Sequence, residues 1–462
     1  MAFQIYDTLS RRKKKFIPRG KIVKMFVCGP TVYDYAHIGH ARSYITFDIV
    51  ARYLRWKGYK LNYVQNITDI DDKIINRARE SGKAPAKLAK EFEKTYLADV
   101  QALNVISVDE YVRASEYVKE IIDQVRRLMK KGFAYQIDDG VYFDISKFSD
   151  YGKLSRQNPD DLQKHRIEPN PQKRNQGDFS LWKKHKEGEP SWPSPFGAGR
   201  PGWHIEDTAI TEKYFGPQYD IHGGGIDLIF PHHECEIAQI EAVSGKKPLV
   251  NYWMHNEFLM VNGEKMAKSL GNFVTIRDAL KNYEPQVLRL FFAATHYRQP
   301  INYSEENLRN TNVVYKKFVD FVLKLKGAKG KSKIKVDSEI AKAKKQFESA
   351  MDDDFNIAGA LAVIFNFMSE INKLIDANKL SSATAKKVYA QMLDFDKVLG
   401  LDLKNIKEEK LPAELMKLIK EREQARKTKD WKTSDRIRNE LKEKGIAVED
   451  LQAGGTRWKK LA

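Results

Sequence analysis

The chain has 462 residues, of which 42% are hydrophobic, and carries 80 Lys and Arg against 62 Asp and Glu, for a formal net charge of +18. This length exceeds what one hydrophobic core usually supports and predicts two to four domains. Two cysteines exclude a disulfide framework, and neither a secretory signal nor a run of about 18 apolar residues is present, so we expect a cytoplasmic protein without a membrane span. The charge favours nucleic acid as a partner, with a solvated basic surface as the alternative.

The first part of the chain predicts a βαβ unit in residues 21–85. A buried strand at 21–28 is followed by an amphipathic helix at 39–58 and a second strand at 60–67. A further helix, with acidic residues in its first turn, is expected within 68–82. These elements indicate the front half of a nucleotide-binding α/β domain.

The middle of the chain predicts short strands at 132–146 and then an irregular loop at 178–204, rich in Pro, Gly and Trp. Long irregular segments inside enzymes are usually functional or disordered, and the tryptophans argue against disorder. Residues 219–245 return to the α/β pattern, with a strand, a glycine turn and a helix. A lysine-rich exposed linker is expected at 324–335 and a helical hairpin at 338–375, before a smaller helical unit at the end of the chain.

The HIGH segment places His37, Gly39 and His40 between the first strand and its helix. Glycine allows a phosphate to approach the backbone, the helix N-terminus favours negative charge, and two imidazoles can bond phosphate oxygens. By itself the pattern is weak and more often marks two surface histidines beside a turn.

A second candidate is the KMAKS segment, where Lys265 and Lys268 lie three residues apart near a glycine. Two lysines on such a loop can stabilise the pyrophosphate that leaves ATP, although most such pairs are merely solvated. The ordered combination is far more specific, because a histidine turn after the first strand and a lysine loop after the last indicate attack of a carboxylate on the ATP α-phosphate.

These motifs, in this order, are the mark of class I aminoacyl-tRNA synthetases. From the first strand to the last few residues, the chain resembles the cysteinyl-tRNA synthetase family in CGPTVYDYAHIGHAR, NITDIDDKI, DFSLWK, RPGWHIE, HGGGIDLIFPHHE, KMAKSLGN, MDDDFN and KDWKTSDRIRNEL. The resemblance implies an α/β fold, in which a Rossmann-type parallel-sheet catalytic domain contains an inserted connective subdomain and precedes α-helical tRNA-binding domains. The expected domains are the first half of the catalytic domain (1–125), the connective insertion (126–220), the second catalytic half (221–300), a stem-contact and helical bundle domain (301–400) and an anticodon-binding domain (401–462).

The implied activity is formation of cysteinyl-adenylate from cysteine and ATP with Mg²⁺, followed by transfer to the 3′-terminal ribose of tRNA(Cys) by a monomer. The implied catalytic residues are His37, His40, Lys265 and Lys268, and the implied ATP-binding residues are His37, Gly39, His40, Gly224, Asp227 and Lys268. Ala267 stands where the family usually has serine, and we expect activity to survive because both lysines remain.

The family binds one zinc ion, whose ligands map onto Cys28, Asp207, His232 and Glu236. His232 and Glu236 are four residues apart and share a helix face, as a metal pair must, although a surface histidine and a salt-bridged glutamate would show the same spacing. Asp207 stands where most of the family has a second cysteine, and aspartate is an accepted zinc ligand. Cys235 is the alternative: it either replaces a ligand or is an unrelated buried thiol.

Zinc would distinguish cysteine from serine, because it binds a thiolate whereas the serine hydroxyl stays protonated. The resemblance implies that Cys28, Thr68 and Trp203 contact the substrate. The alternative for Trp203 is a core tryptophan, and helix capping by Thr68 is compatible with substrate contact.

The last part of the chain, 401–462, holds 17 Lys and Arg against 12 Asp and Glu. Trp431 and Trp458 lie among basic residues, which suits stacking on the unpaired bases of an anticodon loop, although each could instead pack between helices. We expect the residues that read tRNA to be Arg426, Trp431, Asp435 and Arg438.

Two rival functions use similar residues. A tRNA-independent ligase with the same catalytic core would join cysteine to an amino sugar, but it should lack a full anticodon module. A non-catalytic RNA-binding paralogue would be expected to have lost the HIGH segment or the lysine loop, and both are present.

Overall fold

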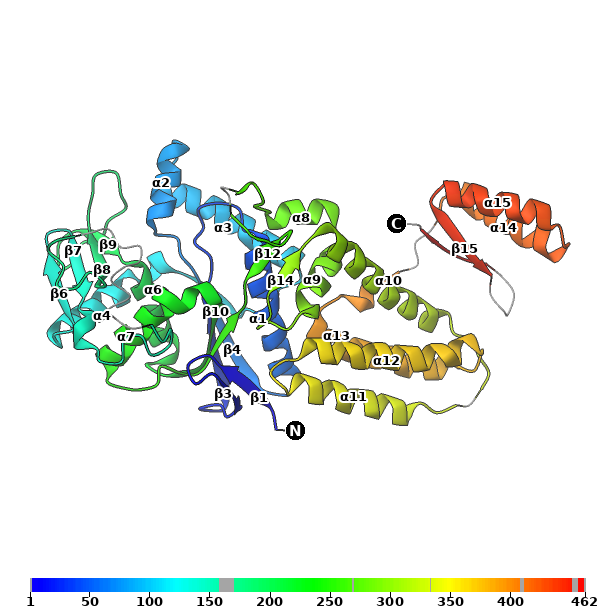
Figure 1. Cartoon of the computed structure of the whole chain (residues 1–462), viewed down its shortest axis with the longest axis horizontal. Helices are drawn as coiled ribbons and strands as arrows, with labels where there is room; N and C mark the ends of the chain where they lie inside the picture. The colour runs from blue at the N-terminus through cyan, green and yellow to red at the C-terminus, as the bar shows by residue number, and fades with distance from the viewer. Residues whose placement is uncertain are drawn as a thin grey trace. The chain divides into compact units, whose positions relative to one another are not determined.

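The computed structural model describes residues 2–157, 170–267, 270–332, 334–407, 411–450 and 456–460 (Figure 1). The chain divides into two compact units, each assembled from segments that are distant in sequence. The larger comprises Met1–Lys316, Ala343–Ile364 and Asp394–Leu401, and the smaller comprises Lys317–Lys342, Phe365–Leu393 and Asp402–Ala462.

The larger unit is built on a five-stranded parallel sheet in the order β11-β10-β3-β4-β5. Its strands are β3 (Ile22–Val27), β4 (Lys60–Ile67), β5 (Glu110–Arg113), β10 (Tyr219–Gly225) and β11 (Val250–Asn256). The chain first adds strands on one side of β3 and later on the other, so the order reverses between β3 and β10. In open parallel sheets, ligands bind beyond the carboxyl ends of the strands at such a reversal. The predicted Rossmann-type fold class is therefore confirmed.

The predicted βαβ unit is confirmed, with α1 (Ile38–Trp56) between β3 and β4. The helix predicted within 68–82 is α2 (Asp72–Glu80), and α3 (Pro85–Ala102) follows it. The side chain of Asp71 caps α2 by accepting a bond from the backbone amide of Lys73 at 2.8 Å. The suggestion that Thr68 caps this helix was wrong, because the helix begins four residues later.

The insertion contains a four-stranded antiparallel sheet, visible beside α4, α6 and α7 in Figure 1. Its elements are α4 (Val118–Lys130), β6 (Ala134–Ile137), β7 (Gly140–Phe143), β8 (Phe179–Lys184) and β9 (Gly199–Pro201), and they are followed by α6 (Trp203–Phe215). The irregular loop expected at 178–204 was therefore wrong in part, since β8 and β9 lie within it. β8 buries Phe179, Leu181 and Trp182 through pairing with β7, a long-range contact that the surrounding Pro and Gly residues concealed.

The three glycines at 223–225 were expected in a turn, but they complete β10. They pair in register with Met254, His255 and Asn256 of β11. A Cβ atom at Gly223 would overlap the ring of Phe47 in α1. Glycine is required here because the strand passes close against a helix. Two short helical segments, η3 (Ile226–Leu228) and η4 (Ile229–His233), separate β10 from α7 (Glu234–Ser244).

Several further elements before residue 305 complete this part of the larger unit. They are the hairpin β1 (Gln4–Asp7) and β2 (Arg12–Lys15), the small sheet of β12 (Leu259–Val261), β13 (Glu264–Lys265) and β14 (Ile301–Tyr303), and the helices α8 (Ile276–Asn282) and α9 (Pro285–Ala294). β13 leads directly into the lysine loop.

The later part of the chain is mainly helical, as predicted. Its helices are α10 (Glu305–Gly327), α11 (Asp337–Met351), α12 (Ile357–Asp376), α13 (Ser382–Leu399), α14 (Ala413–Lys427) and α15 (Trp431–Glu443). α11 and α12 confirm the predicted helical segments, whereas the first residues of the expected linker at 324–335 continue α10. Lys333 of that linker lies outside the described residues. A two-stranded hairpin, β15 (Ile446–Asp450) and β16 (Thr456–Lys460), follows α15 and was not predicted.

Helix α12 is long and apolar enough to cross a membrane by length and composition alone, the one such helix in the described part of the chain. Core helices of water-soluble proteins pass the same test. The buried residues of α12 follow the spacing of a one-sided core helix: Ile357, Ala360, Leu361, Ile364, Phe367, Met368 and Ile371.

Candidate functional site

The predicted metal ligands meet beyond the carboxyl end of β3. Cys28 follows the last residue of this strand, and its backbone amide donates to the carbonyl of Gly223 at 3.0 Å, where β3 and β10 lie side by side. Asp207 comes from α6, while His232 and Glu236 come from the start of α7 and the turn before it. All four are buried, with exposed fractions of 7% or less.

The donor atoms of these four residues lie close together. Oδ2 of Asp207 is 3.2 Å from the Cys28 sulfur and 3.0 Å from Nε2 of His232. Oε1 of Glu236 is 3.1 Å from the same nitrogen and 3.9 Å from the sulfur. Zinc bonds of about 2.0–2.3 Å in a tetrahedral arrangement separate donors by roughly 3.3–3.8 Å. The spacing of the cluster therefore fits one small tetrahedral ion.

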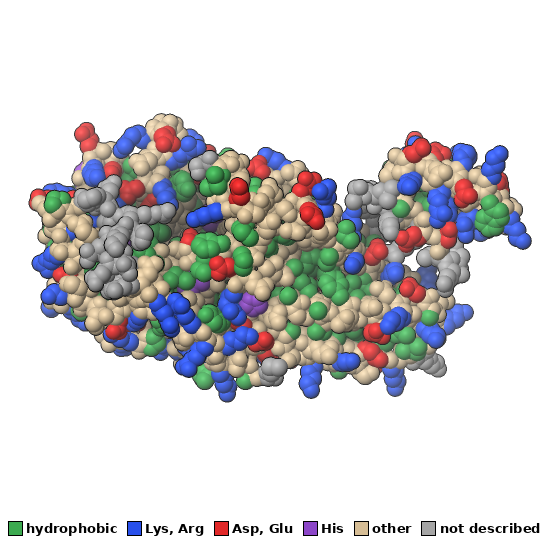
Figure 2. Space-filling model, viewed as in Figure 1, with side chains coloured by type: hydrophobic (Ala, Val, Ile, Leu, Met, Phe, Trp, Pro, Cys, Tyr) green, Lys and Arg blue, Asp and Glu red, His purple; other side chains and the backbone are tan. Residues whose placement is uncertain are grey.

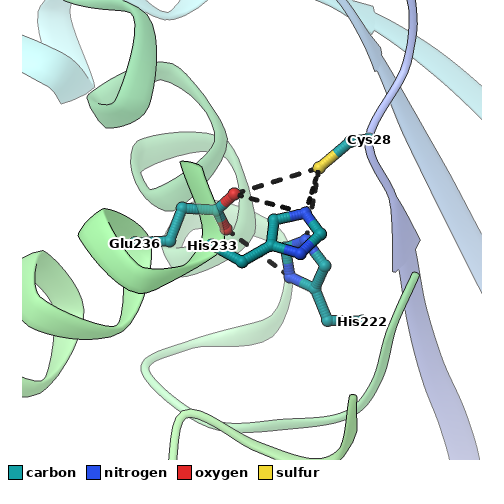
Figure 3. A group of neighbouring side chains, drawn as sticks. All are labelled: Cys28, His222, His233 and Glu236. Carbon is teal, nitrogen blue, oxygen red and sulfur yellow. Dashed lines mark hydrogen bonds and ion pairs between the residues drawn. The ribbon is translucent and has the colours of Figure 1, made fainter. Parts of the chain in front are cut away.

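A second set of four possible ligands shares Cys28 and Glu236 and adds His222 and His233 (Figure 3). Both imidazoles point at the sulfur, with His222 Nε2 at 3.3 Å and His233 Nε2 at 3.1 Å. Because the two sets share two members, they describe competing positions for one ion. Sequence reasoning missed these histidines, although they stand in the HGGG and PHH segments.

Hydrogen bonds behind the two histidines explain their orientation. The hydroxyl of Tyr219 lies 2.6 Å from Nδ1 of His222, and Nε2 of His255 lies 2.8 Å from Nδ1 of His233. If Tyr219 donates to Nδ1, the neutral His222 carries its proton on Nε2, which faces the Cys28 sulfur. An N–H group in this position stabilises the thiolate form of Cys28. His222 would therefore stabilise this ligand as well as compete for the ion.

The electrostatics of the cluster favour a bound cation. Burial and the carboxylates of Asp207 and Glu236 raise the pKa of Cys28 well above its ordinary value. Burial and Asp207 likewise raise the pKa of Glu236, whose Oε2 is buried without a hydrogen bond to any described residue. Burial lowers the pKa of His222 and His233, so these side chains supply no compensating charge. A divalent cation would compensate the anionic forms of the ligands.

The ring of His232 is fixed from two sides. Its Nδ1 lies 2.9 Å from Nδ1 of His204, and its face stacks on Trp203 with centroids 4.4 Å apart. Metal-binding histidines usually hold their second nitrogen in such a hydrogen bond. Trp203 is 36% exposed, so it forms a wall open to solvent and is not a core tryptophan. His204 was not predicted as a site residue.

Cys235 belongs to neither set of possible ligands. It is fully buried in the hydrophobic core, and its sulfur lies 3.3 Å from the hydroxyl of Tyr151. Of the two interpretations of Cys235, this placement favours the buried thiol.

Thr68 lies in the same buried network. Its Oγ1 accepts a long bond of 3.4 Å from Nδ2 of Asn66, which also donates to Oδ1 of Asp207 at 2.6 Å. Asn66 was missed in the sequence, and its signal is a polar side chain at the buried end of β4.

The HIGH segment forms the N-terminus of α1. Nδ1 of His37 accepts from the amide of Gly39 at 3.1 Å, and Nδ1 of His40 accepts from the amide of His37 at 3.2 Å. The two rings stack at 3.8 Å, and burial together with His37 and Lys73 lowers the pKa of His40 well below its ordinary value. A neutral imidazole that accepts at Nδ1 carries its proton on Nε2, so both rings can donate to an anion at this helix terminus.

The segment that follows the lysine loop lies against this turn. The amide of Ile38 donates to the carbonyl of Val274 at 3.1 Å, and His37 pairs with Thr275 in an isolated bridge. The side chain of Asn272 bonds the amide of Ala267 at 2.9 Å and the carbonyl of Lys265 at 3.1 Å, which shapes the loop. Lys268, the second predicted lysine, lies outside the described residues.

The residues predicted for adenosine lie at the end of β10. Gly224 is buried, and a Cβ atom there would meet the ring of His233 at 2.8 Å. Asp227 is exposed in the short helix that follows. Their contact with ATP stays a prediction.

The predicted tRNA-reading residues lie on α14 and α15, where Figure 2 shows exposed Lys and Arg side chains. Trp431 is 54% exposed, and the Arg426 guanidinium lies 5.6 Å from the centre of its ring. Asp435 and Arg438 are also exposed. Trp458, in contrast, packs against the core of this module. Of the two tryptophans, Trp431 is therefore the one available for stacking.

Comparisons with known proteins agree with this arrangement. Residues 15–313 match the tRNA synthetases class I (C) catalytic domain, residues 346–404 the DALR domain, and residues 408–458 the cysteinyl-tRNA ligase anticodon binding domain. A methionyl-tRNA synthetase from Mycobacterium tuberculosis, solved with methionyl-adenylate, has the same fold, with a TM-score of 0.59 at 17% identity over 83% of this chain and 90% of that one. A leucyl-tRNA synthetase in a ternary complex, from Agrobacterium radiobacter K84, gives a TM-score of 0.62 at 11% identity over 84% and 85%.

Full-length relatives are more informative. Cysteine–tRNA ligases from Thermococcus gammatolerans and Pyrococcus horikoshii are 48% and 46% identical to this chain, and each alignment covers all of both proteins. The cysteine–tRNA ligase from Thermoplasma volcanium is 47% identical over 96% of this chain and 97% of its own length. Together with the buried cluster and the paired HIGH and lysine segments, these matches show that the chain belongs to the cysteine–tRNA ligase family of class I aminoacyl-tRNA synthetases.

Proposed function

We propose that the chain attaches cysteine to tRNA(Cys) in two steps, at the expense of ATP. The observation that carries this proposal is the buried cluster of Cys28, Asp207, His232 and Glu236 beside the reversal point of the sheet. It lies where a parallel sheet binds its ligand, and the family match supplies the reaction class.

The cluster is the proposed zinc site. Cys28, Asp207, His232 and Glu236 would hold the ion, which would supply a Lewis-acidic contact to the substrate thiolate and so favour cysteine over serine. The chain's own residues shape the rest of the pocket. Trp203 stacks on His232 at the open side, and Thr68 lies in the network that contacts Asp207.

The proposed activation step uses the HIGH turn and the lysine loop. His37 and His40 would donate from Nε2 to the phosphates of ATP at the N-terminus of α1, with Gly39 allowing close approach. Lys265 and Lys268 would stabilise the departing pyrophosphate, with Mg²⁺ accompanying the nucleotide. Gly224 and Asp227 are the proposed adenosine contacts.

The transfer step would place the terminal ribose of tRNA at this pocket, with attack by the 2′-hydroxyl. Recognition of the tRNA is assigned to Arg426, Trp431, Asp435 and Arg438 in the C-terminal module. We propose a cytoplasmic monomer, with the catalytic halves, insertion, stem-contact and anticodon domains bounded as the sequence predicts.

Two assays test the function. Cysteine-dependent exchange of pyrophosphate into ATP measures activation, and charging of total tRNA measures transfer. We expect both, with a strong preference for cysteine over serine. Exchange without charging would instead support the tRNA-independent cysteine ligase, and the absence of both would support a non-catalytic paralogue.

Metal analysis of variants tests the ligand set. We expect Asp207→Ala and His232→Ala to lose zinc, and Cys235→Ser to retain it. His222→Ala distinguishes the competing set, since it should weaken zinc binding less than His232→Ala does. Unchanged zinc content and activity in Asp207→Ala would refute the proposed set.

A further inference from the structure

Asn66, at the end of β4, contacts one possible metal ligand, Asp207, and the residue that follows another, Cys28. Its Oδ1 accepts from the amide of Gly29, directly after Cys28, at 2.6 Å. Its Nδ2 donates to Oδ1 of Asp207 at the same distance. Asn66 is 2% exposed, so neither bond competes appreciably with water.

The bond to Asn66 leaves the two oxygens of Asp207 with different tasks. Oδ1 is occupied by the amide, whereas Oδ2 faces the Cys28 sulfur at 3.2 Å and His232 Nε2 at 3.0 Å. A carboxylate can bind a metal through either oxygen or through both. Rotation about the side-chain bonds of aspartate interchanges these modes. A cysteine at the same position would present a single donor atom. An orienting partner therefore matters for aspartate in a way that it does not for cysteine.

Close packing fixes the asparagine itself. A Cβ atom at Gly29 would overlap the backbone carbonyl oxygen of Asn66, so the ends of β3 and β4 approach each other closely. The backbone of Thr68 also bonds the carbonyl of Pro30 at 3.1 Å, which ties the two segments together beyond the strands. With the backbone held on both sides of the amide, Asn66 is well placed to hold the carboxylate in one rotamer.

We propose that Asn66 is a positioning residue that fixes Asp207 as a one-oxygen metal ligand. The inference rests on the metal site of the proposed function. Residues that orient metal ligands typically contribute 10–100-fold to metal affinity, and we expect an effect of about this size here.

The test compares Asn66 variants in two backgrounds, the native chain and Asp207→Cys. Asn66→Asp keeps an oxygen to accept from Gly29 but replaces the donor that faces Asp207, and Asn66→Ala removes both contacts. Zinc affinity is measured on the metal-free full-length protein by competition with a chelating dye. We expect each variant to bind zinc about 10–100-fold more weakly in the native background. In the Asp207→Cys background the loss should be less than about threefold for Asn66→Asp.

The two backgrounds separate positioning from a structural role. An equal loss in both would show that Asn66 acts through Gly29 or the fold, and no loss in the native background would show that it does not orient Asp207. Either result overturns the inference. The comparison is the ratio of the two losses of zinc affinity, one measured in each background. Loss of the Gly29 contact is common to both backgrounds, so its effect cancels in this ratio even if Asn66→Ala is less stable.

A spectroscopic readout complements the affinities. Cobalt(II) replaces zinc, and its visible absorption reports the geometry and the number of thiolate ligands. We expect Asn66→Asp to shift the bands of the native background and to leave those of Asp207→Cys unchanged. Asn62→Ala, on the same strand, is the matched control and should change neither spectrum. If the native protein itself bound no stoichiometric metal, the proposed site would fail; if it bound one ion and Asn66→Asp matched it in affinity and spectrum, the inference alone would fail.

Discussion

The proposed metal cluster and the proposed tRNA-binding face of the C-terminal module place their polar groups in opposite environments. This face consists of Arg426, Trp431, Asp435 and Arg438. Asp207, His232 and Glu236 are at most 2% exposed, and each faces other polar side chains. On the C-terminal face, Trp431 is 54% exposed, and Arg426 lies over its ring. Selecting one small ion requires donors that are desolvated and oriented in advance, whereas binding an RNA loop requires aromatic and charged groups that the nucleic acid can reach.

The exposed face nevertheless has a rigid support. The core of the C-terminal module consists of Leu411, Ile419, Ile437, Leu441, Ile446 and Val448. Arg422, which is buried, donates to both carboxylate oxygens of Asp450 at 2.7 and 3.0 Å. In the cluster, the polar side chains proposed to bind the ion are themselves buried. In the C-terminal module, the side chains proposed to bind RNA are exposed, and the buried residues form the core that supports them.

The largest effect is expected for Cys28→Ser, which replaces the sulfur shared by both possible ligand sets. Residues that only orient a ligand contribute 10–100-fold, so loss of a ligand should lower zinc affinity and cysteine-dependent exchange by more than about 100-fold. Metal analysis and the exchange assay measure this. Cys235→Ser is the matched control, because Cys235 lies outside both sets. Retention of zinc and activity in Cys28→Ser would show that the buried cluster does not depend on this sulfur to bind metal.

The next effect is expected for Arg422→Met, which removes the buried support of the exposed face. Breaking a buried ion pair costs about 3–5 kcal/mol, and we expect about 2–4 kcal/mol here because Asp450 is 26% exposed and keeps Arg426. Denaturant unfolding measures the stability. Charging of tRNA should fall with the folded fraction of the module, while pyrophosphate exchange should be unchanged.

Arg436→Met is the control for this prediction, because its pair with Glu440 is a solvent-exposed contact between neighbouring helical turns. Such pairs contribute about 0.3–0.5 kcal/mol. Equal stabilities of the two variants would show that Arg422 gives no special support.

A smaller effect is expected for Trp431→Ala, which removes the exposed ring. Stacking of one base on an aromatic side chain contributes about 1–3 kcal/mol, so kcat/KM for charging should fall by roughly 5–150-fold. Exchange should remain at the native rate, because it does not involve tRNA. Trp431→Phe should recover much of the loss, and undiminished charging in Trp431→Ala would remove this residue from the proposed tRNA-binding face.

The last pair of predictions concerns the response to acid. Burial lowers the pKa of His255 to about 3, against about 6.5 in an unfolded chain. Between these values the unfolded state binds a proton that the folded state does not, so stability falls as pH falls from 6.5 towards 3, by at most about 1.4 kcal/mol per pH unit. Between pH 7.5 and 5, the melting temperature should fall less steeply with decreasing pH for His255→Gln than for the native protein.

The C-terminal module should respond differently to acid. Arg422, followed by Arg426 and Arg438, lowers the pKa of Asp450 against a smaller effect of burial. Stability from this carboxylate is present above its ordinary pKa of 3.8 and is lost only as pH falls further, so Asp450→Asn should not alter melting between pH 7.5 and 5 in the way His255→Gln does. A similar change in slope for both variants would remove this distinction between the two regions.

Local sequence patterns predicted the elements whose structure depends mainly on residues close together in the chain. The apolar spacing of 21–67 predicts β3, α1 and β4, and His232 and Glu236 share a helix face by their four-residue spacing. β8 could not be found in this way, because its apolar residues are buried by pairing with β7, about forty residues earlier. The glycines of β10 resembled a turn for the same reason, since their need for close approach to α1 is not visible along the chain.

The sequence by itself determined the class of the protein, through the order of the HIGH and lysine segments and the resemblance around them, and it identified Cys28, Asp207, His232 and Glu236 as candidate ligands. Only the tertiary structure decided which groups surround those ligands. His222, His233 and Asn66 meet Cys28 and Asp207 across separations of 141 to 205 residues. The parallel sheet and α6 bring these side chains together, because strands and helices far apart in the chain end at the same edge, and the hydrogen bonds formed there are set by that juxtaposition and not by local spacing.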